Sequence, residues 1–123
     1  MSNHVTYSRS IPFSFFGLSI RELSPEGYDL MSVAEIAVPP GAEHPMARST
    51  KCDKLYVCTA GALTFHVGGK AVQMKPSDVL LIRKEEWFSY QNGASEEGRL
   101  LLVHNPPFDL ACEEIAPNQI AAD

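Results

Sequence analysis

The chain has 123 residues, of which 45% are hydrophobic and 20% are charged, and its formal net charge at pH 7 is −5. This length supports one domain with a modest core, and the hydrophobic content indicates a folded globule rather than a disordered chain. The acidic balance argues against nucleic acid and anionic membranes as partners. No apolar run reaches the length of a membrane span.

Two local features bear on where the protein resides. The apolar segment Ile11–Ile20 contains Pro12 and two serines, and we interpret it as an opening strand rather than as the core of a signal peptide. The three cysteines, Cys52, Cys58 and Cys112, are odd in number and lack Cys-x-x-Cys spacing. This pattern predicts a reducing, cytoplasmic setting without a disulfide framework.

Short apolar runs separated by Gly, Pro and Asn predict an all-β protein. In chain order the expected strands are 17–23, 30–38, 55–59, 62–67, 70–74, 79–82, 88–91 and 99–104. Residues 39–45 are expected to form a loop that carries His44. Residues 109–123 are expected to form one short helix or to stay frayed, because Pro117 opposes a long helix. About eight strands in a chain of this size predict a small barrel or a two-sheet jelly roll.

A spaced pattern begins at Gly41. It consists of a glycine, five residues, His-x-His, three or four residues, a glutamate, six residues and a closing glycine. Laid on this sequence, the pattern places its two histidines at Ala47 and Ser49, its glutamate at Lys54 and its closing glycine at Gly61. The spacing of the pattern is kept, although other residues replace its two histidines and its glutamate.

A second pattern begins at Ser77. It consists of a glycine, five residues, Pro-x-Gly, two residues, a histidine, three residues and an asparagine. It places its proline at Arg83, its second glycine at Glu85, its histidine at Phe88 and its asparagine at Asn92. The short segment between the two patterns is typical of compact members of the family that carries them.

Together the two patterns resemble the cupin superfamily, in its small single-domain form, over residues 18–110. The resemblance implies a double-stranded β-helix barrel of the jelly-roll kind. It divides the chain into an N-terminal covering arm (1–16), a barrel (17–108) and a C-terminal tail (109–123). Small members often form dimers through crossing N-terminal strands, so the cluster Phe13, Phe15 and Phe16 predicts a homodimer, with packing into the chain's own core as the alternative.

The four positions that hold the metal in this family carry Ala47, Ser49, Lys54 and Phe88. First-row metals need imidazole, carboxylate or thiolate donors that converge on one point. The sequence therefore predicts no metal and no other cofactor, and it argues against the oxygenase and oxalate chemistry common in the family. A displaced metal site formed by His44, His104 and a cysteine is the less favoured alternative.

Alternation along each strand predicts which residues face the inside of the barrel. The inward set is Ala47, Ser49, Lys54, Tyr56, Cys58, Leu63, Phe65, Val67, Phe88, Tyr90 and Asn92. The outward set is Arg48, Thr64, His66 and Trp87. Such a lining is aromatic with few polar groups, which is typical of a small-molecule site. A barrel filled by its own side chains is the alternative.

Lys54 is the most informative inward residue, and three interpretations of it remain open. It can reach the rim and pair with Asp53 or Glu35. It can anchor an anionic ligand such as a carboxylate. It can also act as a general base or form a Schiff base, because burial favours the neutral amine of a lysine.

The candidate catalytic residues are Lys54, Tyr56, Tyr90 and His104. The candidate ligand-binding residues are His44, Ala47, Ser49, Cys58, Phe65, Phe88 and Asn92. The facing of His104 is undetermined, since both faces of the segment 100–103 are apolar.

The resemblance implies chemistry of the kind performed by metal-free epimerases, isomerases and cyclases. We expect a metal-independent barrel that binds a small, anionic organic molecule and catalyses isomerisation, cyclisation or lyase chemistry by side-chain acid–base catalysis. The alternatives are a non-catalytic ligand-binding sensor and a structural dimer module.

Overall fold

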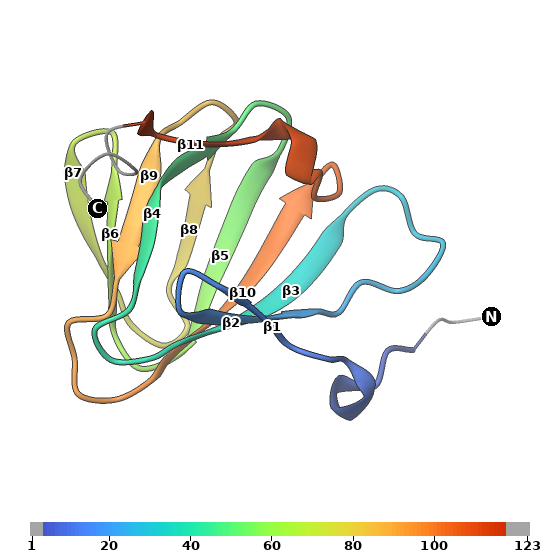
Figure 1. The fold of residues 1–123 in the computed structure, drawn as a ribbon, viewed down its shortest axis with the longest axis horizontal. Helices are drawn as coiled ribbons and strands as arrows, with labels where there is room; N and C mark the ends of the chain where they lie inside the picture. The colour runs from blue at the N-terminus through green and yellow to red at the C-terminus, as the bar shows by residue number, and fades with distance from the viewer. Residues whose placement is uncertain (1–3, 118–123) are drawn as a thin grey trace.

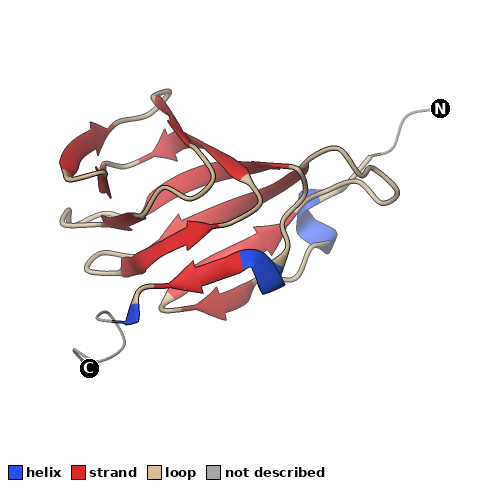
Figure 2. Cartoon of the chain, turned by 90° about the horizontal axis from the view of Figure 1, so that it is seen from above, coloured by secondary structure: helices blue, strands red, loops and turns tan. Residues whose placement is uncertain are grey.

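The computed structural model describes residues 4–117, and strands dominate it (Figures 1 and 2). Its helical content consists of short turns, among them η1 (Tyr7–Arg9) and η2 (Leu110–Cys112). The strands are β1 (Phe13–Phe15), β2 (Leu18–Glu22), β3 (Ser32–Val38), β4 (Glu43–Ser49), β5 (Asp53–Ala60), β6 (Leu63–Val67), β7 (Lys70–Met74), β8 (Val79–Ile82), β9 (Phe88–Gln91), β10 (Gly98–Asn105) and β11 (Glu113–Ile115). The predicted all-β class is confirmed.

The strands form two antiparallel sheets that enclose one core. The first sheet has the order β1-β2-β3-β10-β5-β8, and the second has the order β11-β4-β9-β6-β7. Strands distant in sequence are therefore neighbours, and β10 lies between β3 and β5. This is the predicted jelly-roll barrel. No helix within residues 4–117 combines the length and apolarity needed to cross a membrane.

The alternation of side chains explains how these strands make a core. In β3 and in β10, buried residues alternate with half-buried ones along the strand, as expected when one face of each sheet packs inward. The core consists of Leu18, Ile36, Val38, Ala47, Tyr56, Cys58, Leu63, Phe65, Met74, Ile82, Phe88, Tyr90, Leu100 and Leu102. The inward positions of the two sequence patterns therefore lie in the interior.

The closing glycine of the first pattern marks a close backbone approach. Gly61 has a φ of +74°, and a β-carbon placed there would lie 2.7 Å from the carbonyl oxygen of Glu97 and 2.9 Å from Cα of Gly98. Only glycine fits both the left-handed conformation and this distance. The turn at Gly61 thus joins β5 to β6 against the start of β10.

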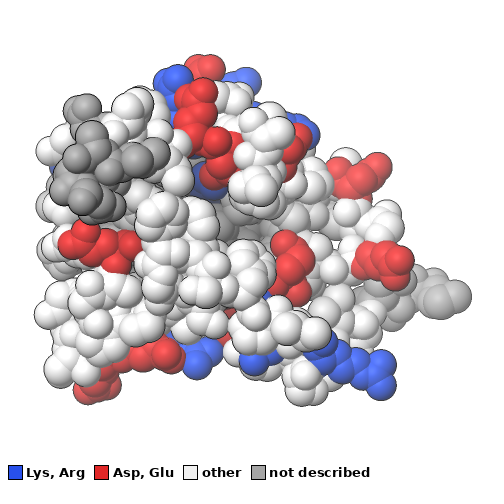
Figure 3. Space-filling model, viewed as in Figure 1, with Lys and Arg blue, Asp and Glu red and all other residues white. Residues whose placement is uncertain are grey.

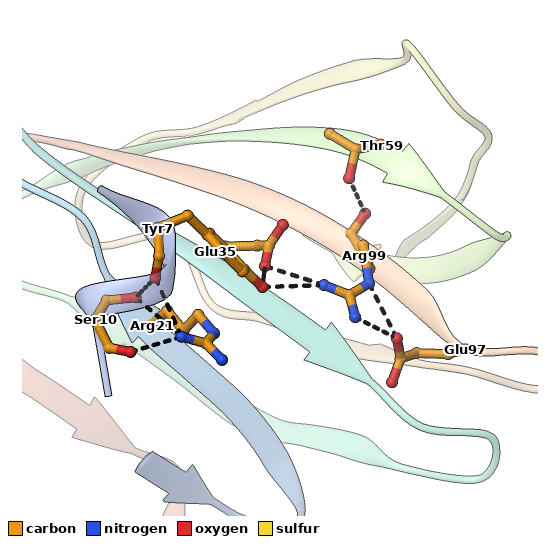
Figure 4. Close-up of polar contacts among 7 residues, drawn as sticks. All are labelled: Tyr7, Ser10, Arg21, Glu35, Thr59, Glu97 and Arg99. Atoms are coloured by element: carbon orange, nitrogen blue, oxygen red, sulfur yellow. Dashed lines mark hydrogen bonds and ion pairs between the residues drawn. The ribbon is translucent and has the colours of Figure 1, made fainter. Parts of the chain in front are cut away.

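The N-terminal segment is held on the outer face of the first sheet by a polar network (Figure 4). The Tyr7 hydroxyl donates to Glu35 Oε1 at 2.6 Å, and Arg99 Nη1 lies 3.1 Å from the same oxygen. Arg21 donates to the Ser10 carbonyl at 2.6 Å, and its guanidinium lies 4.5 Å from the centre of the Tyr7 ring. Opposite charges are paired in this network, which fixes the arm to β2, β3 and β10.

Two expectations about secondary structure are wrong. The expected loop around His44 is strand β4, which pairs with β9 with a register shift between His44 and Ala47. The expected short helix or frayed segment from residue 109 contains η2 and then β11, which pairs with β4 in the second sheet. Residues 118–123 of the predicted tail lie outside the described residues.

Candidate functional site

The centre of the candidate site is a buried cluster of three polar side chains. Lys54 on β5 and His104 on β10 are register partners, and each is only 4% exposed. The Lys54 ammonium donates to His104 Nε2 at 2.9 Å and to Glu113 Oε1 at 2.8 Å. Because β11 runs beside β4, it brings Glu113 to this end of the barrel. The fold thus joins residues that lie up to 59 positions apart.

The electrostatics of the cluster fix the state of the histidine. Burial, and after it the neighbouring charge of Lys54, lower the pKa of His104 from 6.5 to about 3. The ring is therefore neutral near pH 7, and Nε2 accepts the hydrogen bond while the ring proton lies on Nδ1. The positive charge of Lys54 is balanced by Glu113 in a largely buried ion pair.

Four aromatic side chains pack next to this cluster, and each is at most 1% exposed: Tyr56, Phe65, Phe88 and Tyr90. The Lys54 ammonium lies 5.7 Å from the centre of the Phe88 ring. The Tyr56 ring lies 5.0 Å from Phe65 and 5.6 Å from Tyr90, in edge-to-face arrangements. Edge-to-face contacts are a favourable geometry for aromatic rings, so the rings fill this part of the interior.

Both phenol groups keep their protons. Burial raises the pKa of Tyr56 well above its usual 10, and the adjacent Tyr90 and Glu113 raise it further. Burial likewise raises the pKa of Tyr90, against the smaller opposing effect of Tyr56. Each phenol is therefore a neutral hydroxyl at physiological pH that can donate one hydrogen bond.

Two buried oxygens of the interior have no hydrogen-bond partner. Within the described residues, the buried side-chain polar atoms left unpaired are Tyr90 Oη and Glu113 Oε2. Buried polar atoms are nearly always paired in native proteins, so an unpaired one needs an explanation. A bound molecule that supplies the missing partners is one such explanation.

His44 lies on β4 beside the aromatic group. Its ring is stacked 4.9 Å from Tyr90 and 5.1 Å from Phe88, and Phe15 of the N-terminal hairpin lies 5.6 Å away. Its Nδ1 lies 2.7 Å from the Pro45 carbonyl, which places the ring proton on Nδ1 and leaves Nε2 as an acceptor. Burial lowers the pKa of His44 from 6.5 to about 4, although the bond to Pro45 opposes this shift and Lys54 adds to it.

The face that carries the β11 segment is hollowed near its centre, as Figure 3 shows in the same view as Figure 1. In Figure 1, β11 crosses the upper end of the barrel and the β1–β2 hairpin lies below it. Acidic and basic side chains are mixed along the upper edge of this face. Glu113 is the first residue of β11 and contacts Lys54, so the Lys54–His104–Glu113 cluster lies at this end of the barrel.

The structure corrects the expected partners of Lys54. Asp53 Oδ1 accepts a hydrogen bond from the backbone of Lys84, and Glu35 pairs with Arg99 on the outside of the sheet. Neither carboxylate forms the predicted pair with Lys54, because both belong to the outward or edge positions of their strands. The partner is instead Glu113, which the sequence analysis did not single out.

Three expected ligand-binding residues have structural roles. The Asn92 amide donates to the carbonyls of Val38 and Glu96, and its Oδ1 accepts from the backbone of Ala94. Ser49 Oγ accepts from the backbone N–H groups of Lys51 and Cys52, which closes a turn. Cys58 Sγ contacts the Ala60 carbonyl, and burial raises the pKa of this thiol. Their polar atoms are occupied within the chain.

The remaining expected positions fall in two groups. Ala47 and Phe65 are buried in the core at 3% and 0% exposure, so they shape the interior without offering a polar group. Arg48 and Trp87 contact each other outside it, with the guanidinium 4.7 Å from the centre of the indole ring. His66 is half-buried on an outward position of β6.

The residues at the family's metal-binding positions do not fit a metal ion. A lysine whose ammonium is already bonded to His104 and Glu113 stands where a carboxylate donor is required, and a positive charge repels a cation. Residues 4–117 contain no group of three or more His, Cys, Asp or Glu side chains that could hold a metal ion. The alternative site from His44, His104 and a cysteine is not assembled in this part of the chain.

The chain was compared with known proteins. The model of the Cupin domain family matches residues 34–104, and no curated protein matches the sequence. A Streptomyces PAC13 variant solved with uridine is 15% identical, with a TM-score of 0.82 over 94% of this chain and 91% of that one. Pac13 is called a unique nucleoside dehydratase.

Two further solved structures show the same fold. The polyketide cyclase RemF from Streptomyces resistomycificus is 18% identical, with a TM-score of 0.74 over 85% of this chain and 80% of that one. KdgF from Halomonas sp. is 10% identical, with a TM-score of 0.79 over 89% and 97% of the two chains. These neighbours support the fold, and the match of the family model over most of the barrel leads to the assignment. The chain belongs to the Cupin domain family.

Proposed function

We propose that this cupin binds a small organic molecule at the β11 end of its barrel and catalyses a metal-independent elimination of the lyase or dehydratase type. The observation that carries the proposal is the buried Lys54–His104–Glu113 cluster. It stands beside two neutral phenols, and its Lys54 occupies one of the four positions at which the family resemblance places a metal ligand. Titratable groups with displaced pKa values that converge in an interior are typical of catalytic sites.

The structural neighbours support this choice among the expected classes. Pac13 is named as a nucleoside dehydratase, and its solved variants with uridine include two tyrosine-to-phenylalanine changes and one histidine-to-glutamine change. RemF is named as a cyclase. The present chain likewise has two buried tyrosines and a stacked histidine in its interior. A nucleoside-like or other ring-shaped hydroxylated substrate is therefore our first candidate.

The geometry suggests a role for each group in an elimination. The free Nε2 of neutral His44 removes a proton from the carbon next to the departing hydroxyl group. The C–O bond then breaks, and the proton taken by His44 is returned to the departing oxygen as water forms. Tyr56 and Tyr90 donate hydrogen bonds rather than protons, since their pKa values are raised. Glu113 and neutral His104 hold the Lys54 ammonium in place beside these groups.

The dense packing of the interior favours a second candidate, a non-catalytic binding protein. The four rings of Tyr56, Phe65, Phe88 and Tyr90 contact one another and leave little exposed surface. A sensor that opens only for its ligand, or a module that acts through assembly, is compatible with such packing. Catalysis and binding are separated by measuring both on the same variants.

The test uses uridine and related ribonucleosides as substrates. Loss of water is followed by mass spectrometry, and binding is followed by calorimetry. We expect His44→Gln to abolish turnover and to keep binding within a few-fold, while His66→Gln on the outer face changes neither. Binding without turnover in the unmodified protein would support the sensor. Metal independence is tested on protein purified without a nickel column, in which dialysis against a chelator is expected to leave turnover unchanged.

The expected cytoplasmic location also remains a proposal. It rests on Cys52, Cys58 and Cys112, all three of which are free, as is usual in a reducing compartment. Thiol labelling of the protein in intact cells and in the medium would test it. Full labelling of denatured protein without prior reduction is expected.

A further inference from the structure

The charge inside this barrel is already balanced, and this limits what the site accepts. Lys54 is the buried cation of the described residues, and Glu113 compensates it at 2.8 Å. His104 and His44 are neutral near pH 7. An anion that entered the site would meet the Lys54 ammonium, whose charge Glu113 already compensates, and it would be repelled by the Glu113 carboxylate. The anionic guest expected from Lys54 alone therefore loses its physical basis.

Glu113 and its neighbour Glu114 lie on opposite faces of β11. Strand β11 pairs with β4 so that Glu113 lies opposite Ser49 and Glu114 lies opposite Arg48. Successive side chains of a strand point to opposite faces. Glu114 accordingly bonds to Arg48 at 2.7 Å on the outer side, whereas Glu113 turns inward to Lys54. The two adjacent glutamates thus have different environments and provide a matched pair.

The two carboxylate oxygens of Glu113 differ in their partners. Its Oε1 binds Lys54, while its Oε2 is buried and has no partner within the described residues. A carboxylate oxygen only accepts hydrogen bonds, so the missing partner is a donor. The hydroxyl of Tyr90, more than nine-tenths buried, is also unpaired and can donate or accept. The Tyr56 ring lies 5.6 Å from the Tyr90 ring, and Tyr56 is two residues from Lys54 on the same face of β5, where Lys54 binds Glu113. This arrangement places the two unpaired oxygens in one region.

We propose that Glu113 Oε2 binds a hydroxyl group of a neutral substrate, so that strand β11 makes the site selective for uncharged hydroxylated molecules over anions. This inference rests on the proposed function and specifies its substrate class. A hydrogen bond to an ionised group contributes more than one between neutral groups. Glu113 therefore contributes to affinity because it accepts a hydrogen bond from the substrate hydroxyl. It contributes to selectivity because it balances the positive charge of Lys54.

The test measures binding of two neutral probes, uridine and ribose, and two anionic probes, uridine 5′-monophosphate and ribose 5-phosphate. Calorimetry and amide NMR shifts are recorded for the unmodified protein and for Glu113→Gln and Glu114→Gln. We expect the unmodified protein to bind each neutral probe at least about tenfold more tightly than its phosphate. Glu113→Gln should weaken uridine binding about tenfold or more and shift the preference toward the phosphates, because Lys54 is then uncompensated.

The outcomes separate this inference from the proposed function. Glu114→Gln should bind all probes as the unmodified protein does. If Glu113→Gln binds uridine unchanged, or if the unmodified protein prefers the phosphates, the inference is overturned while turnover of a ribonucleoside can still stand. If the unmodified protein binds none of the four probes, both are overturned for ribose-containing molecules. Retention of the amide NMR spectrum of Glu113→Gln shows that the variant is folded.

Discussion

The Lys54 ammonium lies 2.8 Å from Glu113 Oε1, next to a core of mainly aromatic and aliphatic side chains. The contact joins β5 of the first sheet to β11 of the second sheet. It is therefore an ion pair between the two layers of the barrel as well as the centre of the candidate site. Its removal should affect both stability and binding, and the two effects can be separated.

Replacement of Lys54 by methionine should destabilise the protein strongly, because it leaves the Glu113 carboxylate buried without its partner. Breaking one side of a buried pair costs about 3–5 kcal/mol. The double variant Lys54→Met/Glu113→Gln should recover a large part of this loss, since it removes both charges. Urea unfolding of the single and double variants measures the free energy of unfolding. Equal stability of the single variant and the unmodified protein would show that the pair is solvated, and Lys51→Met at the exposed pair with Asp109 is the control.

Replacement of Tyr90 by phenylalanine should leave the protein as stable as before or stabilise it by about 1 kcal/mol, because the lost hydroxyl has no partner. The same change should lower turnover of the ribonucleoside substrate, since it removes a donor. Thermal unfolding and product formation are measured on one preparation. A stability loss of several kcal/mol would mean that the hydroxyl is paired in the folded protein. Met74→Leu, elsewhere in the core, is the comparison.

Stability should fall as the pH falls below about 6.5. The pKa values of His44 and His104 are about 4 and about 3 in the folded protein, against 6.5 for an exposed histidine. Between these values the unfolded chain binds protons that the folded chain does not. Each histidine therefore lowers the free energy of unfolding by about 1.4 kcal/mol for each pH unit of acidification. Above pH 6.5 both histidines are neutral in the folded and the unfolded chain, so the folded protein has its full stability. This stability is lost progressively on acidification toward pH 4.

Urea unfolding between pH 7.5 and 4.5 measures this dependence. His104→Gln keeps an acceptor for Lys54 but cannot titrate, so its stability should decline less steeply with acid than that of the unmodified protein. His66→Gln, on an outward position of β6, should decline as steeply as the unmodified protein. Parallel curves for all three proteins would contradict the assignment of the effect to the buried ring.

We retain the homodimer as a prediction, because the N-terminal hairpin exposes large apolar side chains. Phe13 and Ile11 are 53% and 85% exposed in the isolated chain, and a crossing N-terminal strand would cover them. Light scattering after size exclusion should give twice the mass of one chain. The double change Ile11→Ser/Phe13→Ser should give the mass of one chain, whereas Leu110→Ser, at a 72% exposed position on η2, should not. A monomeric unmodified protein would refute the prediction.

The strands that the sequence predicts well are those in which apolar residues alternate or run together, such as 32–38 and 88–91. The spacing of the two patterns also places Lys54, Tyr56 and Tyr90 in the interior, because a fixed register determines which face each residue takes. Strand β4 is missed since it contains Pro45 and few β-branched residues, and its pairing with β9 supplies what its local propensity lacks. His104 is ambiguous because apolar residues occupy both faces of β10.

Glu113 is the residue of the candidate site that the sequence does not reveal. The run Glu113-Glu114-Ile115 has no strand signature, and a pair of acids near the end of a chain is more often solvated. Its importance depends on the pairing of β11 with β4, which connects residues more than sixty positions apart. Such long-range pairing is decided by the tertiary fold, so no local pattern could have distinguished Glu113 from its neighbour.

Strand β11 also has a consequence for the order in which the protein matures. The ten strands that enclose the core end at Asn105, but the carboxylate that completes the interior follows η2. Until β11 pairs with β4, Lys54 lacks its counter-charge. A chain truncated before Glu113 would keep the ten strands but would bury the Lys54 ammonium without its counter-charge, so the truncation should lower stability as well as binding.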